Sequence, residues 1–242
     1  MSILFSTFCV IFLLFSLGES VEKVGFETIQ AVSASQFKCL ASNSTLPYVF
    51  VRVGLADGSI DPVGIQNLAN AYEGGFNVSI VQILPFFIPS FTTDPKIQLA
   101  KIQNALKKTN ITLFYLYADI NAVKWSSVKS KNQKYLSDLH NAIVLTDSKP
   151  GYSTNYSSWN NALGSSFSID KDYQPNLLWT QNTGKMNYSG FVKFGGWNTP
   201  DYHLWKSNVN ICGVNVAQVW RDTKANAVQR KSSFFNRLET MK

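Results

Sequence analysis

The sequence predicts an α/β fold, a single irregular TIM-like (β/α) barrel. Strand-like and helix-like stretches alternate in units of about 30 residues, a pattern typical of a parallel sheet. The run at residues 114–118 is almost continuously apolar, as expected of a strand covered on both faces. No glycine-rich phosphate-binding loop follows the first expected strand, so a barrel is favoured over an open, doubly wound sheet.

The individual elements follow from local patterns. Runs rich in aromatic and β-branched residues predict strands, and apolar residues at helical spacing predict helices between them. The expected strands are residues 25–30, 48–53, 77–84, 113–118, 176–180 and 202–206. The expected helices cover residues 34–41, a segment from Pro62 to Gly74, a segment beginning at Pro95, and residues 131–140. After about residue 150 the helical periodicity fades, which predicts irregular last strands.

Two of these helices have clear start signals. Asp61 and Asp94 each precede a proline, and this pair is favoured at the N-cap and first turn of a helix. The first helix is expected to end at Gly74 and Gly75. The expected inner faces are Ile65, Leu68, Ala69 and Tyr72, then Leu99, Ile102 and Leu106, and then Tyr135, Leu136 and Leu139.

The first 20 residues resemble a secretory signal peptide. Residues 3–15 are apolar, a short polar exit follows, and Gly18 and Ser20 supply small residues for cleavage. A run of about 14 apolar residues is short for a membrane span. We therefore expect a secreted protein, with a signal peptide at residues 1–20, one barrel domain at residues 21–222 and a basic tail at residues 223–242. After signal removal no stable membrane insertion is expected.

Cysteine usage agrees with an oxidising compartment. Cys9 leaves with the signal peptide, so Cys39 and Cys212 remain. One bridge between them is the simplest arrangement, and two unpaired thiols are the alternative. A metal site is disfavoured because His140 and His203 lack a ligand-like spacing to either cysteine. No metal and no cofactor are predicted.

Five Asn-X-Ser/Thr sequons fit the same compartment, since such sites accept N-linked glycans in secreted proteins. They begin at Asn43, Asn77, Asn110, Asn155 and Asn187. Each sequon alone is a weak signal, but five in one chain predict that some are used. Asn110 is well placed in the expected loop before the strand at residues 113–118.

The chain carries a formal net charge of +7, which becomes +8 when Glu19 leaves with the signal peptide. Basic proteins often meet anionic polymers or membranes. Much of the excess lies at the C-terminus, in Arg221, Lys224, Arg230, Lys231, Arg237 and Lys242. A solvated tail and a contact with a bacterial wall or membrane are both open. Nucleic acid is not an expected partner, because the chain has no recognisable binding module.

The candidate catalytic residues lie at the ends of expected strands. In a parallel barrel, functional side chains gather at the C-terminal ends of the strands. Asp119 and Asn121 follow a buried strand, and residues two apart on a strand share a face. Two carboxylates in this arrangement would form an acid/base pair for glycoside hydrolysis, but Asn121 has no proton to donate.

A second acidic group, Glu27, lies in the first expected strand. Charged residues are rarely buried for packing alone, so Glu27 is expected to face the barrel mouth. The alternatives are a surface-facing Glu27 and an Asp119 that caps the following helix. Aromatic side chains that can stack on sugar rings complete the candidate site: Tyr117, Trp125, Trp179 and Trp205.

Six short motifs in order carry a resemblance to a known family. They are ASQFKC at residues 34–39, YVFVR at 48–52, AYEGGF at 71–76, DIN at 119–121, FGGW at 194–197 and ICG at 211–213. Together they resemble the glycoside hydrolase family 25 lysozymes, in particular the secreted branch described from nematodes and amoebae. The resemblance implies an irregular barrel of that family's type, a Cys39–Cys212 bridge and a groove for the sugar strand of peptidoglycan.

The resemblance also implies where the chain departs from active members. The family's Asp-Ile-Glu motif falls on Asp119, Ile120 and Asn121, and its Glu is the proton donor. The first-strand Asp falls on Glu27, and a further Asp falls on Ala217. The acidic set is therefore degenerate.

Three functional hypotheses follow. The first is a secreted, monomeric, catalytically impaired lysozyme-like protein that binds peptidoglycan or another glycan, in innate defence or as a secreted regulator. The alternative is an active muramidase in which Glu27 and Asp119 are the remaining carboxylates. The third is a barrel that serves only as a scaffold for protein contacts.

Overall fold

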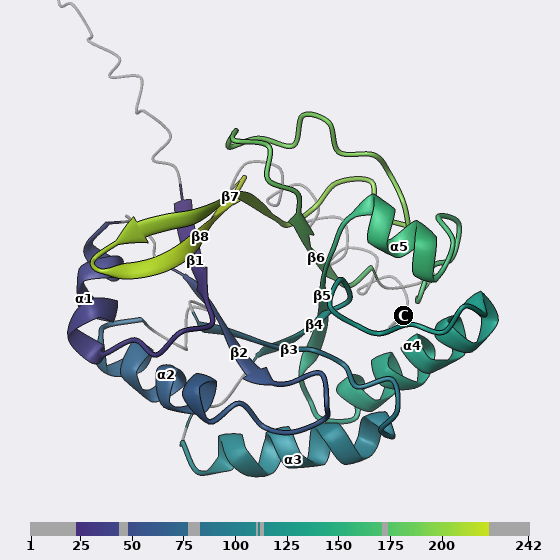
Figure 1. The fold of residues 1–242 in the computed structure, drawn as a ribbon, viewed down its shortest axis with the longest axis horizontal. Coiled ribbons are helices and arrows are strands. Elements are labelled where there is room, and N and C mark those ends of the chain that lie inside the picture. The colour runs from purple at the N-terminus through teal and green to yellow at the C-terminus, as the bar shows by residue number, and fades with distance from the viewer. Residues whose placement is uncertain are drawn as a thin grey trace, which may run out of the picture.

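The protein folds into one closed barrel with helices on its outside, in a computed structural model that describes residues 23–43, 48–76, 83–109, 111, 114–170 and 174–222 (Figure 1). The strands are β1 (Lys23–Thr28), β2 (Val49–Gly54), β3 (Ile83–Phe87), β4 (Tyr115–Asp119), β5 (Lys149–Thr154), β6 (Asn176–Thr180), β7 (Tyr202–Ile211) and β8 (Val214–Arg221). The helices are α1 (Ala34–Ser42), α2 (Pro62–Glu73), α3 (Pro95–Lys107), α4 (Lys129–Val144) and α5 (Tyr156–Ala162). The predicted α/β barrel is confirmed.

The barrel is irregular where it closes. Strands β1 to β7 pair in parallel with their neighbours in chain order. Strand β8 is antiparallel to both β7 and β1. A tight turn joins β7 to β8, with positive φ values of 57° at Cys212 and 74° at Gly213, as a two-residue hairpin turn requires. No crossover helix is needed for this connection, so β8 closes the barrel as a hairpin.

The helix start signals are confirmed. Asp61 accepts hydrogen bonds from the backbone N–H groups of Val63 and Gly64, and Asp94 accepts one from Lys96. The inner faces predicted for α3 and α4 are largely confirmed. Their predicted members Leu99, Ile102, Leu106, Leu136 and Leu139 are buried, and Tyr135 is half-buried.

The inner face predicted for α2 is partly wrong. Leu68 is buried as expected, but Tyr72 is 57% exposed, and Gly64 and Asn67 face inward instead. A Cβ atom at residue 64 would overlap the carbonyl oxygen of Arg52, so this glycine lets the helix lie directly against β2. The Asn67 side chain bonds backbone groups of the β1–α1 loop. These contacts set the rotation of α2, and apolar periodicity alone does not report them.

Several elements were not predicted. Strands β5 and β8 and the short helix α5 lie in the second half of the chain, where periodicity is weak. The expected strand at residues 77–84 begins outside the described residues, and β3 extends it to Phe87. The signal peptide and the basic tail also lie outside them, so the domain limits stay predictions. Within the described part of the chain, no helix is long and apolar enough to cross a membrane.

The barrel interior is filled by aromatic side chains. The Phe50 ring lies 5.1 Å from Tyr117 and 5.4 Å from Tyr202, and Tyr48 lies 5.3 Å from Tyr202, all edge to face. The Tyr48 hydroxyl donates a 2.8 Å hydrogen bond to the Val219 carbonyl oxygen. We call the four rings of Tyr48, Phe50, Tyr117 and Tyr202 the interior plug.

Two glycines make room for this plug. A Cβ atom at Gly25 would overlap the Tyr48 ring, and one at Gly151 would lie 2.5 Å from a Tyr117 ring carbon. Because the plug fills the centre of the barrel, polar side chains at the strand ends lie above it, at the barrel mouth. The mouth is formed by the C-terminal ends of the parallel strands.

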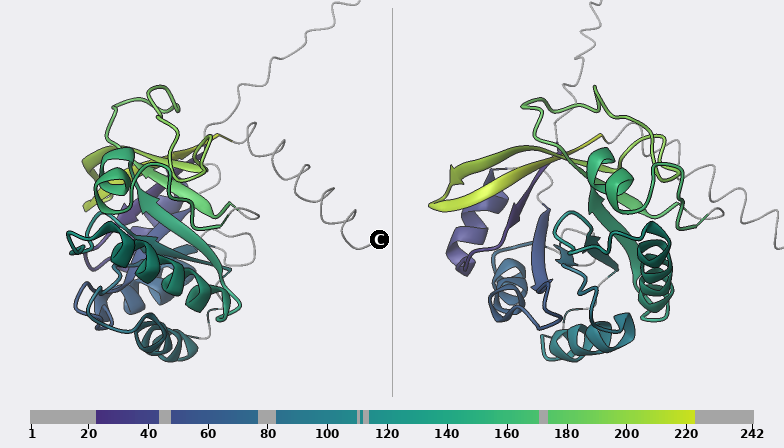
Figure 2. Two further views of the ribbon diagram at one scale, coloured as in Figure 1. Left: turned by 90° about the vertical axis from the view of Figure 1, so that its right-hand side faces the viewer. Right: turned by 45° about the vertical axis from the view of Figure 1, so that its right-hand side comes forward.

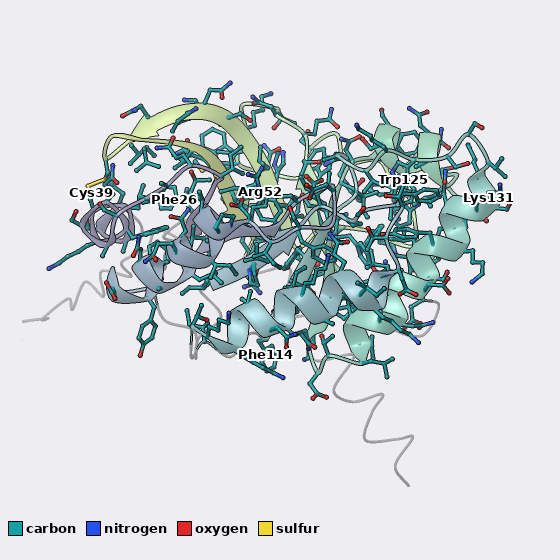
Figure 3. All side chains as sticks on the ribbon, turned by 60° about the horizontal axis from the view of Figure 1, so that its bottom comes forward. Phe26, Cys39, Arg52, Phe114, Trp125 and Lys131 are labelled. Atoms are coloured by element: carbon teal, nitrogen blue, oxygen red, sulfur yellow. A yellow bond between two sulfur atoms is a disulfide. The ribbon has the colours of Figure 1, made fainter. Side chains whose placement is uncertain are left out.

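The predicted Cys39–Cys212 disulfide is present, with the Cα atoms 6.0 Å apart. It joins α1 to the turn of the β7–β8 hairpin, which reaches out past the barrel over α1 (Figures 2 and 3). The bridge spans 173 positions along the chain and ties the first helix to the last strands.

Replacing both cysteines, as Cys39→Ala with Cys212→Ala, is expected to lower the free energy of unfolding by about 2–4 kcal/mol, because the unfolded chain regains entropy. Denaturant unfolding of the variant and of wild type measures this loss. Wild type treated with a thiol reductant is the matched control and should lose the same amount. An unchanged unfolding midpoint in both samples would contradict the assignment.

Candidate active site at the barrel mouth

Two carboxylates point into the barrel at its mouth. Phe26 packs outward among the helices, so Glu27, the next residue of β1, faces inward. Tyr117 belongs to the interior plug, so Asp119, two residues later on β4, faces inward above it. Both carboxylates are half-buried, and they lie close enough for the charge of Asp119 to act on Glu27.

Burial raises the pKa of both carboxyl groups. Desolvation, and secondarily the charge of Asp119, raises the pKa of Glu27 to about 8. Desolvation also raises the pKa of Asp119 to about 6, although the backbone N–H of Asn121 opposes this shift by donating a 3.0 Å hydrogen bond. Near neutral pH, Glu27 therefore holds its proton while Asp119 is ionised. This is the division of states that an acid and a base require.

Neither alternative role for these residues fits the structure. A surface-facing Glu27 is excluded because the side chain is half-buried inside the barrel. Asp119 is not a helix cap, because α4 begins only at Lys129 with Val128 at its N-cap. Its side chain instead accepts from the backbone N–H of Asn121.

Asn121 lies in the turn that follows β4, not on the strand. The prediction that it shares a strand face with Asp119 is wrong, because β4 ends at Asp119. Its amide nevertheless reaches the mouth. The amide nitrogen donates a 2.8 Å hydrogen bond to the Thr180 hydroxyl, and the amide oxygen accepts from Asn155 at 3.3 Å and Thr154 at 3.4 Å. The amide thus links the ends of β4, β5 and β6.

Thr154, Asn155 and Thr180 were not predicted as site residues. They lie at the ends of β5 and β6, where the strand-end rule applies. Residues 149–154 carry no strand pattern in the sequence, so the strand-end rule does not indicate Thr154, whereas Thr180 is the last residue of the strand predicted at residues 176–180. The strand-end rule could therefore have identified Thr180 from the sequence, but not Thr154.

Ala217 faces Glu27 directly, since the two residues are paired across the antiparallel β1–β8 ladder. A methyl group therefore occupies the position at which the resemblance implies a further acidic residue. Within the described residues, no three metal-ligating side chains come together.

The four predicted sugar-stacking residues differ in their exposure and in their distance from the mouth. Tyr117 and Trp179 are 0% and 1% exposed, so neither ring can contact a ligand and this part of the prediction is wrong. Tyr117 belongs to the interior plug, and Trp179 points outward and stacks on His203 at 4.1 Å. Trp205 is half-buried on β7, where its backbone carbonyl accepts from the Gly184 N–H.

Trp125 is the predicted aromatic residue that lies beside the mouth. It is half-buried, its indole N–H donates to the Ile120 carbonyl at 3.2 Å, and its ring packs edge to face against Phe91. It lines a hollow of about 230 Å³ next to Asn121. The hollow is completed by Ile120, Ser126, Ser158, Asn161 and Ala162. An aromatic wall with polar rim groups is suited to a sugar ring.

The sequons differ in position. Asn43 and Asn187 are exposed, on the C-cap of α1 and in the loop between β6 and β7. Asn155 is half-buried at the mouth. Asn77 and Asn110 lie outside the described residues, so their roles stay predictions.

Comparison with known proteins decides the family. A family model described as lysozyme-like protein 1 matches residues 19–205. The chain belongs to this lysozyme-like family. Lysozyme-like protein 5 of Caenorhabditis elegans is 26% identical to it over 212 residues, which make up 86% of this chain and 96% of that protein. The probable GH family 25 lysozyme 4 of Dictyostelium discoideum is 24% identical, over 81% of this chain and 89% of that protein.

A solved structure agrees with the family assignment at the level of the fold. The muramidase from Trichobolus zukalii superposes on this lysozyme-like protein with a TM-score of 0.62 at 14% identity, covering 85% of this chain and 96% of that one. The resemblance to the glycoside hydrolase family 25 lysozymes is thus confirmed, and the barrel is of their type.

Because the pKa of Glu27 is raised, Glu27→Gln is expected to increase the free energy of unfolding by an amount that depends on pH. From pH 4.5 to about 8 the unfolded chain ionises Glu27 while the folded protein keeps it protonated, so wild type loses stability as pH rises. At about 1.4 kcal/mol per pKa unit, the stability gain of the variant over wild type should grow to at most about 5 kcal/mol as pH rises from about 4.5 to about 8.

Denaturant unfolding of both proteins at acidic and mildly alkaline pH measures this difference. Glu73→Gln, at an exposed carboxylate on α2, is the matched control and should show no such trend. A Glu27→Gln effect that is the same at every pH would mean that the carboxyl has an ordinary pKa.

Proposed function

We propose that this lysozyme-like protein is secreted, binds peptidoglycan or a related glycan at the barrel mouth as a monomer, and is impaired in hydrolysis. Its role would then be in innate defence or as a secreted regulator. Membership of the lysozyme-like family and the peptidoglycan-hydrolase fold support the ligand class. The Cys39–Cys212 bridge supports an oxidising compartment.

The observation that carries the proposal is the state of Asn121. General acid catalysis contributes roughly 10²–10⁴-fold to such reactions, because a sugar alkoxide is a poor leaving group until it is protonated. The Asn121 amide has no acidic proton. Its nitrogen is held by Thr180 and its oxygen by Asn155 and Thr154, so it is a fixed hydrogen-bonding group at the mouth.

The rest of the mouth is suited to binding. Asp119 and Glu27 present a carboxylate and a carboxylic acid that can accept from and donate to sugar hydroxyls. Trp125 walls the neighbouring hollow, and the volume of that hollow suits one sugar ring. A groove with these groups needs no proton donor at residue 121 in order to hold a glycan.

Asn121→Glu should create lytic activity, by about 10²–10⁴-fold over wild type if the groove is intact. The measurement is release of reducing sugars from purified peptidoglycan, with a pull-down on insoluble peptidoglycan to score binding. Asn121→Gln is the matched control, since it has the length of Glu without the acid. If Asn121→Glu were as inactive as Asn121→Gln while both bound peptidoglycan, the missing proton donor at residue 121 would not explain the lack of hydrolysis by wild type. Absence of peptidoglycan binding by wild-type protein made without N-linked glycans would refute the proposed ligand.

A second candidate function is weak muramidase activity, and the pKa values of the two carboxylates favour it. Glu27, with its pKa near 8, would protonate the leaving sugar, and Asp119, with its pKa near 6, would act as base or nucleophile. Such activity should be bell-shaped in pH. It should rise as Asp119 ionises toward about pH 6 and fall as Glu27 loses its proton above about pH 8.

Sugar release by wild type across acidic to alkaline buffers checks this candidate. Glu27→Gln should remove the alkaline limb together with most of the rate, and Asp119→Asn should remove the acidic limb in the same way. Activity that survives both substitutions unchanged would exclude the pair as its source.

A further inference from the structure

One sequon lies within the candidate site itself. Asn155 is the N-cap of α5, and its side-chain oxygen accepts from the Ser158 backbone N–H at 3.0 Å. Its amide nitrogen points the other way, into the mouth. There it donates to the Asn121 side-chain oxygen at 3.3 Å and to the Thr180 carbonyl oxygen at 3.4 Å. The nitrogen that would carry a glycan therefore lies against the residue at the proton-donor position.

N-glycosylation of Asn155 is chemically compatible with this geometry. In the transfer, the amide nitrogen forms a bond to the anomeric carbon of N-acetylglucosamine, the bond from that carbon to its lipid pyrophosphate carrier breaks, and the nitrogen gives up one proton. The remaining N–H can keep one of the two hydrogen bonds. The other hydrogen-bonding direction, toward Asn121 or Thr180, is then replaced by the sugar. Both directions lead into the mouth.

We propose that Asn155 is a glycosylation site whose first N-acetylglucosamine occupies the barrel mouth and competes with peptidoglycan. This inference rests on the proposed glycan-binding function. The tethered sugar is chemically the same as one of the two sugars that alternate in peptidoglycan. A ligand held by a covalent link acts at a high effective concentration, so it competes even where its intrinsic affinity is low.

The other described sequon asparagines lack this arrangement. Asn43 lies at the C-cap of α1, and its amide nitrogen donates to the Cys39 carbonyl oxygen at 2.8 Å. The Asn187 side-chain oxygen accepts from the Ser189 N–H, and its neighbour Tyr188 contacts Trp220 and bonds the Asp201 carbonyl, near the end of the barrel opposite the mouth. A glycan there would leave the mouth open. Asn187 is therefore a natural control for Asn155.

The experiment compares the full-length protein secreted from a eukaryotic host with two sequon variants. Ser157→Ala abolishes the Asn155 sequon but keeps the Asn155 side chain and its hydrogen bonds, and Ser157 is itself exposed. Ser189→Ala abolishes the Asn187 sequon in the same manner. Mass spectrometry reports occupancy, and pull-down on purified insoluble peptidoglycan reports binding. Protein from cells in which N-glycosylation is inhibited serves as the glycan-free reference, and thermal unfolding confirms that each variant is folded.

Asn155 should be occupied in wild type, and Ser157→Ala should bind peptidoglycan roughly tenfold more tightly than wild type, as the glycan-free protein does. Ser189→Ala should bind as wild type does. Trimming wild type with an endoglycosidase that leaves one N-acetylglucosamine should not restore binding, because the first sugar is the competitor. An unoccupied Asn155, equal binding by wild type and Ser157→Ala, or recovery on trimming would each overturn the inference. Failure of the glycan-free protein to bind peptidoglycan would instead refute the proposed function on which it rests.

Discussion

The interior plug is the contact on which the rest of this structure depends. Four aromatic rings meet edge to face inside the barrel, and they fit because Gly25 and Gly151 have no side chain to oppose them. The Tyr48 hydroxyl adds a hydrogen bond to the strand that closes the barrel. With its centre filled in this way, the barrel presents accessible polar groups at the mouth, where the strand ends determine which groups meet.

The chemistry of the mouth follows from that enclosure. Glu27 and Asp119 lie above a layer of aromatic rings, so water solvates their charges poorly and each carboxyl holds its proton more firmly than usual. Asn121 lies just outside this layer and is exposed. Its side-chain amide forms hydrogen bonds with Thr180, Thr154 and Asn155. One mouth thus combines a perturbed acidic pair with a neutral, immobilised amide.

Sequence patterns predicted the local features and missed those that tertiary packing decides. Capping residues fixed the starts of α2 and α3, and a single pair of cysteines allowed one bridge. Strand β5 was missed because Pro150 and Gly151 are poor strand formers, and Gly151 makes sense only with the Tyr117 ring against it. The exposure of the individual aromatic rings could not be predicted from the sequence either. Tyr117 and Trp179 both lie in apolar strand runs and are enclosed, whereas Trp125, between Lys124 and Ser126, lines the hollow beside the mouth.

The β7–β8 hairpin closes the barrel, and a disulfide holds the turn of this hairpin in place. Among the described residues no crossover helix leads into β8, and the bond between Cys39 and Cys212 fastens the β7–β8 hairpin to α1. Reduction of that bond would release the hairpin turn from α1, while the β1–β8 ladder that carries Glu27 stays hydrogen-bonded. The redox potential of the surroundings would thereby act on the outer side of this hairpin, although no cysteine lies in the mouth. A barrel closed in this manner is best suited to work where thiols stay oxidised.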